Sequence, residues 1–145
     1  MINAADILRE KQTAEAYSIS PQATVYEALK IMADKDIGAL LVLENGKLAG
    51  MFSERDYARK VILRGRHSQD TLVREIMITD VVTVNPSQNL KECLELITYH
   101  RVRHLPVMED DRVAGIISIG DIVKGIITHH EFMIEQLEDY IKGWH

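Results

Sequence analysis

The feature that most constrains this chain is an internal repeat. Shifting the sequence by 65 residues aligns it with itself without a gap. Identical residues then coincide, for example Pro21 with Pro86 and Asp56 with Asp121, and apolar positions match in kind between them. A period longer than about 50 residues favours a duplicated small fold over a solenoid, whose repeats are shorter.

Each copy predicts the same opening elements. Apolar or alternating segments at 16–19 and 81–84 predict short strands, and a proline follows each of them. Apolar residues at helical spacing then predict helices over 24–35 and 89–100. Each helix begins with a good N-cap residue and has a glutamate three positions later, as a capping box requires. These residues are Thr24 with Glu27 and Asn89 with Glu92.

A hairpin and a closing helix complete each copy. Strands over 38–43 and 47–52 flank an Asn-Gly dipeptide, which favours the type I′ turn, whereas the second copy carries Asp-Asp there. Closing helices are predicted from residue 54 to about 63 and from 119 to about 128. The order β-α-β-β-α, present twice, predicts a mixed α/β (α+β) fold built from two repeated units.

Composition and charge narrow the class of protein. The 145 residues are 46% hydrophobic and 27% charged, which is typical of a globular protein. A net charge of -5 argues against nucleic acid as a partner, because nonspecific binding to phosphates needs a basic surface. No segment has the length of a signal peptide's apolar core or of a membrane span. We therefore expect a cytoplasmic protein with no membrane partner.

The cysteine and histidine pattern gives no sign of a disulfide framework or a metal site. The only cysteine, Cys93, lies on the apolar stripe of a predicted helix and is interpreted as a small core residue. The adjacent residues His129, His130 and Glu131 lack the four-residue histidine spacing of a zinc-binding helix. We expect no metal ligands and no catalytic residues.

The repeated pattern resembles the cystathionine beta-synthase (CBS) domain in its tandem form, often called a Bateman module. The resemblance depends on GMFSERD at 50–56 and GIISIGD at 115–121, which match the family's Gly-h-x-Ser/Thr-x-x-Asp signature, where h is apolar. RHLPV at 103–107 is a second familiar string of the family. The chain is also similar to small stand-alone CBS-pair proteins of bacteria and plant organelles.

The resemblance implies a domain organisation. The CBS repeats are expected at 12–66 and 77–128, packed with pseudo-two-fold symmetry. Helical extensions are expected at 1–11 and 129–145, and the apolar residues of the second extension need a cover. Because the family commonly dimerises through its helices, a homodimer is expected.

The Ser-x-x-Asp part of the signature has two interpretations. Serine can cap the helix that follows, with the aspartate near the positive end of the helix. The same helix start offers N–H groups to phosphate, and a carboxylate can accept hydrogen bonds from both ribose hydroxyls. The resemblance favours nucleotide binding in addition to capping.

By resemblance, two ligand sites lie between the repeats, and we name them after their aspartates. Residues expected at the Asp121 site are Ser118, Asp121, Gln12, Thr13, Tyr17 and Ile37, with Arg103 and His104 at the phosphates. Residues expected at the Asp56 site are Ser53, Asp56, Ile78, Val82 and Val102. Gly38 and Ala39 replace the basic pair at the Asp56 site, so Arg55 is expected to compensate and equal occupancy is not expected.

Structural alternatives stay open for the basic residues. Arg103 could form a surface salt bridge, and His104 could be an ordinary half-buried histidine. A basic stretch between the repeats is interpreted first as a solvated helix face, then as a polyphosphate-facing surface, and last as a nucleic-acid patch. This stretch comprises Arg55, Arg59, Lys60, Arg64 and Arg66.

The sequence thus predicts a non-catalytic regulatory module. Its ligand is expected to be AMP, ADP, ATP or NAD(H), and S-adenosylmethionine is a further ligand that the family allows. Ligand binding would favour one arrangement of the repeats and act on an unidentified regulated protein. The alternatives are a dimeric interaction adaptor with vestigial clefts and, third, a small hydrolase or transferase.

Overall fold

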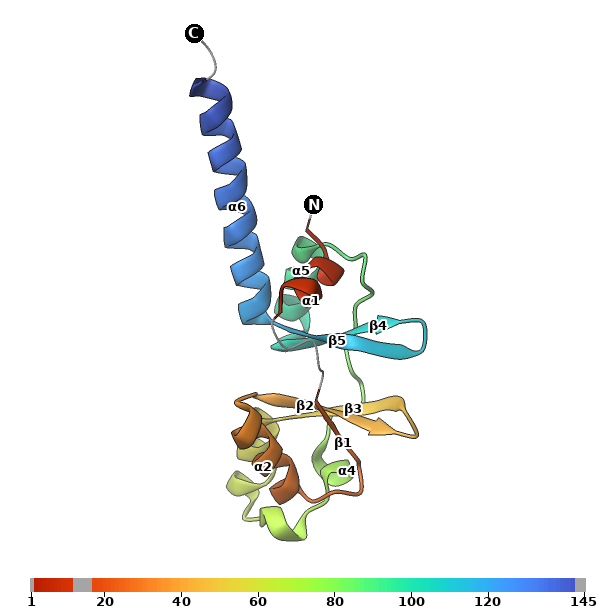
Figure 1. Cartoon of the computed structure of the whole chain (residues 1–145). Helices are drawn as coiled ribbons and strands as arrows, with labels where there is room; N and C mark the ends of the chain where they lie inside the picture. Colours follow the sequence, from red (N-terminus) through yellow and green to blue (C-terminus); the bar gives the residue numbers. More distant parts are fainter. Residues whose placement is uncertain (1, 12–16, 143–145) are drawn as a thin grey trace. The chain divides into compact units, whose positions relative to one another are not determined.

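The computed structural model describes residues 2–11 and 17–142, which fall into two compact units (Figure 1). The first-repeat unit contains Glu15–Val82 and Met108–Ala114. The second-repeat unit contains Met1–Ala14, Thr83–Val107 and Gly115–His145. The predicted mixture of helices and strands in two repeated units is confirmed. The N-terminal segment belongs to the second-repeat unit, although it precedes the first repeat in the sequence.

The first-repeat unit is a three-stranded sheet covered by helices. Its elements are β1 (Ser18–Ile19), α2 (Val25–Lys35), β2 (Ala39–Glu44), β3 (Lys47–Ser53), α3 (Glu54–Lys60) and α4 (Val73–Ile76). Strand β2 pairs in parallel with β1 and antiparallel with β3. The hairpin turn has φ 54° at Asn45 and 78° at Gly46, both positive as a type I′ turn requires. The core comprises Ile19, Val25, Ala28, Met32, Leu40, Val42, Phe52, Val61, Val73 and Ile76.

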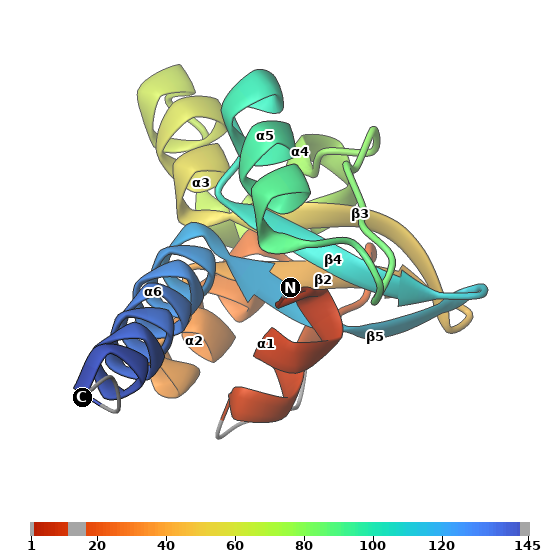
Figure 2. The same ribbon diagram turned by 90° about the horizontal axis from the view of Figure 1, so that it is seen from above.

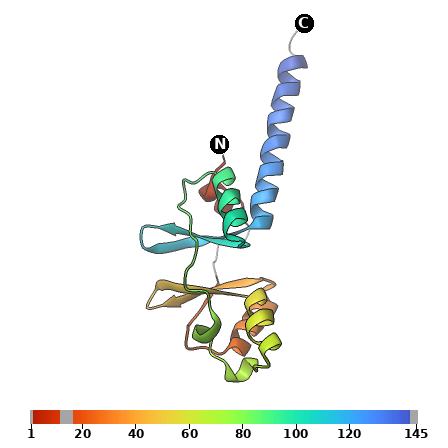
Figure 3. The same ribbon diagram turned by 180° about the vertical axis from the view of Figure 1, so that it is seen from behind.

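The second-repeat unit has one hairpin and three helices (Figure 3). Its elements are α1 (Ala4–Glu10), α5 (Leu90–His100), β4 (His104–Glu109), β5 (Arg112–Ser118) and α6 (Ile119–Lys142), except that the hairpin end at Met108–Ala114 is grouped with the first-repeat unit. Asn89 and Glu92 form the predicted capping box of α5, whereas at α2 only the bond from the Glu27 N–H to Thr24 is present. The buried Cys93 thiol is a core group, as predicted, and burial raises its pKa to about 11.

The strand predicted at 81–84 is wrong. Only an isolated parallel bridge between Val84 and Val107 forms there. In the first repeat, the Leu41 N–H donates to the Tyr17 carbonyl at 3.1 Å. The position equivalent to Leu41 is Pro106, which has no N–H, so the second repeat lacks this hydrogen bond.

The closing helices differ in length from the prediction. Helix α3 ends at Lys60 and continues only as a 3₁₀ turn over Ile62–Arg64, which Gly65 terminates with a φ of 67°. Helix α6 instead continues without a break to Lys142, so the closing helix predicted to end near residue 128 and the helical extension expected from 129 form one helix. The residue equivalent to Gly65 is His130, which has no such preference for the left-handed conformation that ends a helix.

Helix α1 packs on α6 within the second-repeat unit (Figure 2). The Ala4 N–H donates to the carbonyl of Gln88 at 2.9 Å, which ties the start of α1 to the segment before α5. A Cβ atom at Gly125 of α6 would lie 2.5 Å from Ile7 Cδ1 and 2.9 Å from Leu90 Cδ1. Glycine therefore allows the close approach of the helices, and this docking brings the end of α1 to strand β5.

Candidate functional site

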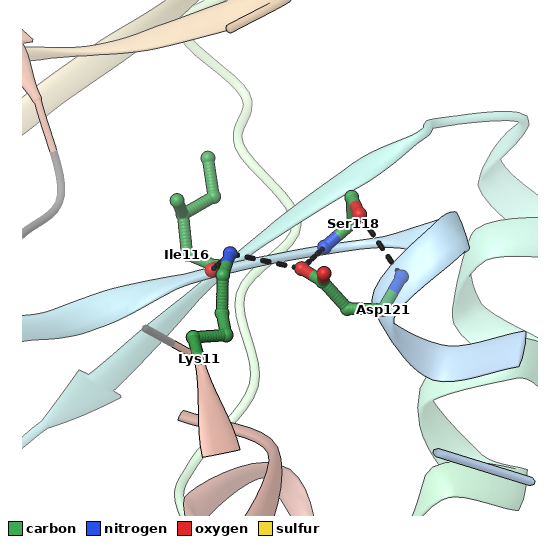
Figure 4. A network of polar contacts seen from close by, with 4 residues as sticks. All are labelled: Lys11, Ile116, Ser118 and Asp121. Carbon is green, nitrogen blue, oxygen red and sulfur yellow. Dashed lines mark hydrogen bonds and ion pairs between the residues drawn. The ribbon is translucent and has the colours of Figure 1, made fainter. Parts of the chain in front are cut away.

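In the second-repeat unit, the Ser-x-x-Asp motif spans the junction where β5 runs into α6 (Figure 4). The Ser118 N–H donates to Asp121 Oδ2 at 2.9 Å, and the Asp121 N–H donates to Ser118 Oγ at 3.1 Å. This reciprocal pair is a capping box, which satisfies donors that have no partner within the helix. The capping interpretation is therefore confirmed for this repeat.

The Asp121 carboxylate also binds a lysine from the start of the chain. Lys11 follows α1, and its Nζ donates to Asp121 Oδ2 at 2.9 Å and to the Ile116 carbonyl at 2.9 Å. Oδ2 thus accepts two hydrogen bonds, whereas Oδ1 has no partner among the described residues. Burial alone would raise the pKa of Asp121, but the hydrogen bonds from Lys11 and Ser118 outweigh it and hold the pKa below its ordinary value.

Arg103 and His104 lie close to the same junction. The Ile119 N–H donates to the Arg103 carbonyl at 2.9 Å, which ties the start of β4 to the start of α6. His104 is half-buried; burial, then the charge of Lys11, lower its pKa and favour the neutral imidazole. Arg103 is exposed and forms no ion pair with the described residues, so the salt-bridge alternative finds no support there.

The first-repeat unit contains the same capping device at the junction of β3 and α3. The Ser53 N–H donates to Asp56 Oδ2 at 2.9 Å, and the Asp56 N–H donates to Ser53 Oγ at 3.2 Å. Ser53 Oγ also donates to Asp56 Oδ2 at 3.0 Å. Lys60 Nζ lies 3.3 Å from Asp56 Oδ1 and donates to the Ile76 carbonyl at 3.1 Å. Both carboxylate oxygens of Asp56 are therefore occupied within this unit.

Each aspartate has a lysine partner, but the two differ in where that lysine comes from and in how exposed the carboxylate is. Lys60 comes from the same helix as Asp56, one turn later, whereas the equivalent position in α6 is Gly125. The second repeat uses Lys11 of the N-terminal segment instead. The Asp56 side chain is 6% exposed and that of Asp121 is 26% exposed. Of the two carboxylates, Asp121 is thus the one that has access to solvent and an oxygen without a partner in the described segments.

The residues expected at the Asp121 site are partly brought together. Ser118, Asp121, Arg103 and His104 share the second-repeat unit. Tyr17 and Ile37 are half-buried in the first-repeat unit, where Lys35 Nζ lies 5.3 Å from the centre of the Tyr17 ring. Gln12 and Thr13 lie outside the described residues.

The residues expected at the Asp56 site are also divided. Ser53, Arg55 and Asp56 flank the start of α3, and Ile78 exchanges two backbone hydrogen bonds of 2.9 Å with Met51 of the neighbouring β3. Val82 is half-buried in the same unit, whereas Val102 belongs to the second-repeat unit. Each complete site would draw on both units, so its assembly stays a prediction.

Comparison with known proteins decides the family. The family model for the CBS domain matches residues 4–63 and 73–133. The chain belongs to the CBS-domain family. CBS-pair proteins are regulatory modules, and many of them bind nucleotides or related ligands.

Three similar proteins illustrate the match. The mitochondrial CBS domain-containing protein CBSX3 of Arabidopsis thaliana is 40% identical over 125 residues, which cover 83% of this chain and 61% of CBSX3. A CBS-domain protein of known structure from Burkholderia ambifaria is 47% identical, with a TM-score of 0.85, over 88% of this chain and 95% of that chain. The CBS pair of MJ0100, solved with 5′-methylthioadenosine and S-adenosyl-L-methionine, is 23% identical, with a TM-score of 0.78. That match covers 88% of this chain and 98% of that chain, and it shows the fold alone.

The basic stretch between the CBS repeats is only partly a solvated helix face. Arg55, Arg59 and Arg64 are exposed as predicted. Lys60 and Arg66 are half-buried and engaged, Lys60 with Asp56 and Arg66 with Glu75 at 2.8 Å. A cavity of about 220 Å³ lies at this end of α3, lined by Lys60, Arg64, Arg66, Glu75, Ile76 and Met77.

Two further features bear on the class of site. Among the side chains that the structure describes, no three His, Cys, Asp or Glu groups gather as metal ligands would. None of the helices described for residues 2–11 and 17–142 combines the length and the apolar character needed to cross a bilayer.

Proposed function

We propose that this CBS pair is a regulatory module that binds an adenosine-containing ligand through Asp121 and passes the ligand state to a partner protein. The candidate ligands are AMP, ADP, ATP and NAD(H), and S-adenosylmethionine extends the same class. The observation that supports this proposal most strongly is a partly exposed carboxylate at a helix start whose Oδ1 has no partner among residues 2–11 and 17–142. That oxygen is free to accept a hydrogen bond from a ribose hydroxyl, while Arg103 nearby supplies a positive charge for phosphate.

The Asp56 site is proposed as the weaker of the two. A ribose there would first have to displace Lys60 or Ser53, because both carboxylate oxygens are already occupied. MJ0100 offers a precedent for the ligand class, since its CBS pair was solved with two adenosine-containing compounds. The regulatory effect would follow from linkage, because a ligand shifts a conformational equilibrium only by its difference in affinity for the two states.

Ligand binding is tested by thermal unfolding of the purified protein. Each nucleotide that binds only the native state should raise the free energy of unfolding, by about 2.7 kcal/mol at a hundredfold excess over Kd. Melting curves with millimolar AMP, ATP or NAD should therefore shift to higher temperature. Buffer of the same ionic strength without nucleotide should not cause a shift. If no curve moves and mass spectrometry finds no nucleotide released from the denatured protein, the adaptor hypothesis is favoured instead.

A homodimer formed through α6 is the second part of the proposal. Ile119, Val123 and Ile127 recur at four-residue spacing on this helix and are 39%, 43% and 53% exposed. Apolar residues in such a stripe are usually covered by another surface. Light scattering should return twice the chain mass of 16.5 kDa.

The dimer proposal has a matched pair of variants. Ile127→Glu should lower the measured mass toward that of one chain, because it places a charge in the apolar stripe. Lys124→Glu changes an exposed residue of the same helix and should leave the dimer intact. A parent protein of single-chain mass across a wide concentration range would contradict the proposal.

The regulated partner is proposed to be a separate protein, and the compartment is proposed to be the cytoplasm. A single buried cysteine with no disulfide suits a reducing environment. The Arabidopsis relative is named as mitochondrial, so family members occupy more than one compartment.

A further inference from the structure

Lys11 occupies the carboxylate oxygen that a ribose would need. A ribose presents two adjacent hydroxyls, which are best accepted by both oxygens of one carboxylate. Asp121 Oδ1 has no partner in the part of the chain that the structure describes, but Oδ2 already accepts from the Ser118 N–H and from Lys11 Nζ, both at 2.9 Å (Figure 4). The Ser118 bond belongs to the helix cap and is fixed by the backbone. Lys11 is therefore the partner that a second ribose hydroxyl would displace.

Displacement would leave Lys11 anchored but without its anionic partner. Its Nζ would keep the hydrogen bond to the Ile116 carbonyl, and α1 would stay docked through Ile7 and Ala4. An ammonium group next to a filled site attracts a negative charge, and a phosphate of the same ligand supplies one. A neutral nucleoside supplies no negative charge, so its binding would break the ion pair between Lys11 and Asp121 without replacing it.

We propose that Lys11 sets the charge selectivity of the Asp121 site. It competes with ribose for Asp121, and once displaced it attracts only ligands that carry phosphate. The inference rests on the proposed function, because it concerns the same ligand and the same carboxylate. It gives Lys11 a different effect from Arg103. Arg103 is exposed and does not contact Asp121, so it can attract phosphate but cannot oppose binding of adenosine.

The test compares adenosine, AMP and ATP by calorimetry on the parent, Lys11→Met and Lys11→Arg proteins. Lys11→Met keeps the apolar stem and removes the charge. It should bind adenosine about threefold more tightly, in line with a partly exposed ion pair, and ATP about tenfold more weakly, as expected for a lost charged hydrogen bond. Lys11→Arg should keep the parent's preference for ATP.

Two controls separate charge selectivity from a structural role. Lys91→Met removes an exposed lysine of α5 and should leave all three affinities at the parent values. A melting curve for each variant checks that it is folded at the temperature of the titration. Arg103→Ala should weaken ATP while leaving adenosine unchanged, which distinguishes simple phosphate attraction from competition for the carboxylate.

The outcomes are distinct. If Lys11→Met binds adenosine no more tightly than the parent, or if its ratio of ATP to adenosine affinity is unchanged, the inference about Lys11 is wrong and the proposed function stands. If the parent binds none of the three compounds, the proposed function itself is wrong, and the inference is overturned with it.

Discussion

Asp121→Ala should reduce the affinity for adenosine-containing ligands at least tenfold. The substitution removes the carboxylate at the start of α6, whose Oδ1 has no hydrogen-bond partner among the described residues. Hydrogen bonds to a charged group are worth about 1.5–3 kcal/mol each where they are shielded from water, and about 1.4 kcal/mol corresponds to a factor of ten in Kd. Calorimetric titration with AMP and ATP measures the loss.

The matched variants are Asp139→Ala and Asp56→Ala. Asp139 is exposed on the same helix, so its removal changes the net charge equally and should leave the affinity unaltered. Asp56→Ala should instead lower stability, by about 1–3 kcal/mol, because it leaves the half-buried Ser53 and Lys60 without their acceptor. If both aspartate variants bind every nucleotide as the parent does, Asp56 and Asp121 are helix caps only and the adaptor hypothesis replaces the sensor.

Gly50→Ala should destabilise the protein more than the same substitution at the equivalent glycine of the second repeat. A Cβ at Gly50 would lie 2.5 Å from the Ile78 carbonyl oxygen and 3.0 Å from Met77 Sδ. The Ile78 oxygen accepts the Met51 N–H at 2.9 Å, so the backbone pairing must move to admit the methyl group. We expect a loss of about 3 kcal/mol, at the upper end for overpacking, which is roughly 10 °C in Tm.

Gly115→Ala is the control for this experiment, because Gly115 holds the same position in the second repeat. Its added Cβ would meet the Leu8 side chain, at 2.6 Å from Cδ2, and no backbone atom. A leucine side chain can change rotamer more easily than a paired backbone can shift, so the loss should be about 1 kcal/mol. Equal melting temperatures for the two variants would show that the backbone contact of Gly50 does not govern its requirement for glycine.

Much of the fold could be predicted because the two copies support each other. The spacing that places α2 after Thr24 recurs at α5 after Asn89, and both helices lie within a residue of the prediction. The errors arose where the copies differ in one backbone property. Pro106 cannot donate the hydrogen bond that Leu41 donates, and His130 does not end a helix as Gly65 does. An alignment of apolar positions does not show such local differences in backbone hydrogen bonding and conformation.

The candidate site could be predicted only where the interacting residues belong to one short motif. The Ser-x-x-Asp spacing predicts a capping box, and both boxes form. Lys11 could not be found in this way, because it is 110 residues from Asp121 and its equivalent in the second repeat is Ile76. The only available signal was indirect: Gly125 stands where Lys60 stands in the first repeat, so the cation near Asp121 had to come from elsewhere.

The docking of α1 on the second repeat affects the order in which the chain can be completed during synthesis. Helix α1 leaves the ribosome before the first repeat, yet Gln88 and Gly125, which hold it, are made long afterwards. An isolated helix of seven residues is not stable in water, so this segment waits unfolded while the first repeat is already able to form its own sheet. Docking of α1 closes a loop of the chain that contains the whole first repeat, and only then does Lys11 reach Asp121. The lysine pair of the first repeat can therefore form early in synthesis, whereas the pair at Asp121 can form only after the second repeat has been made.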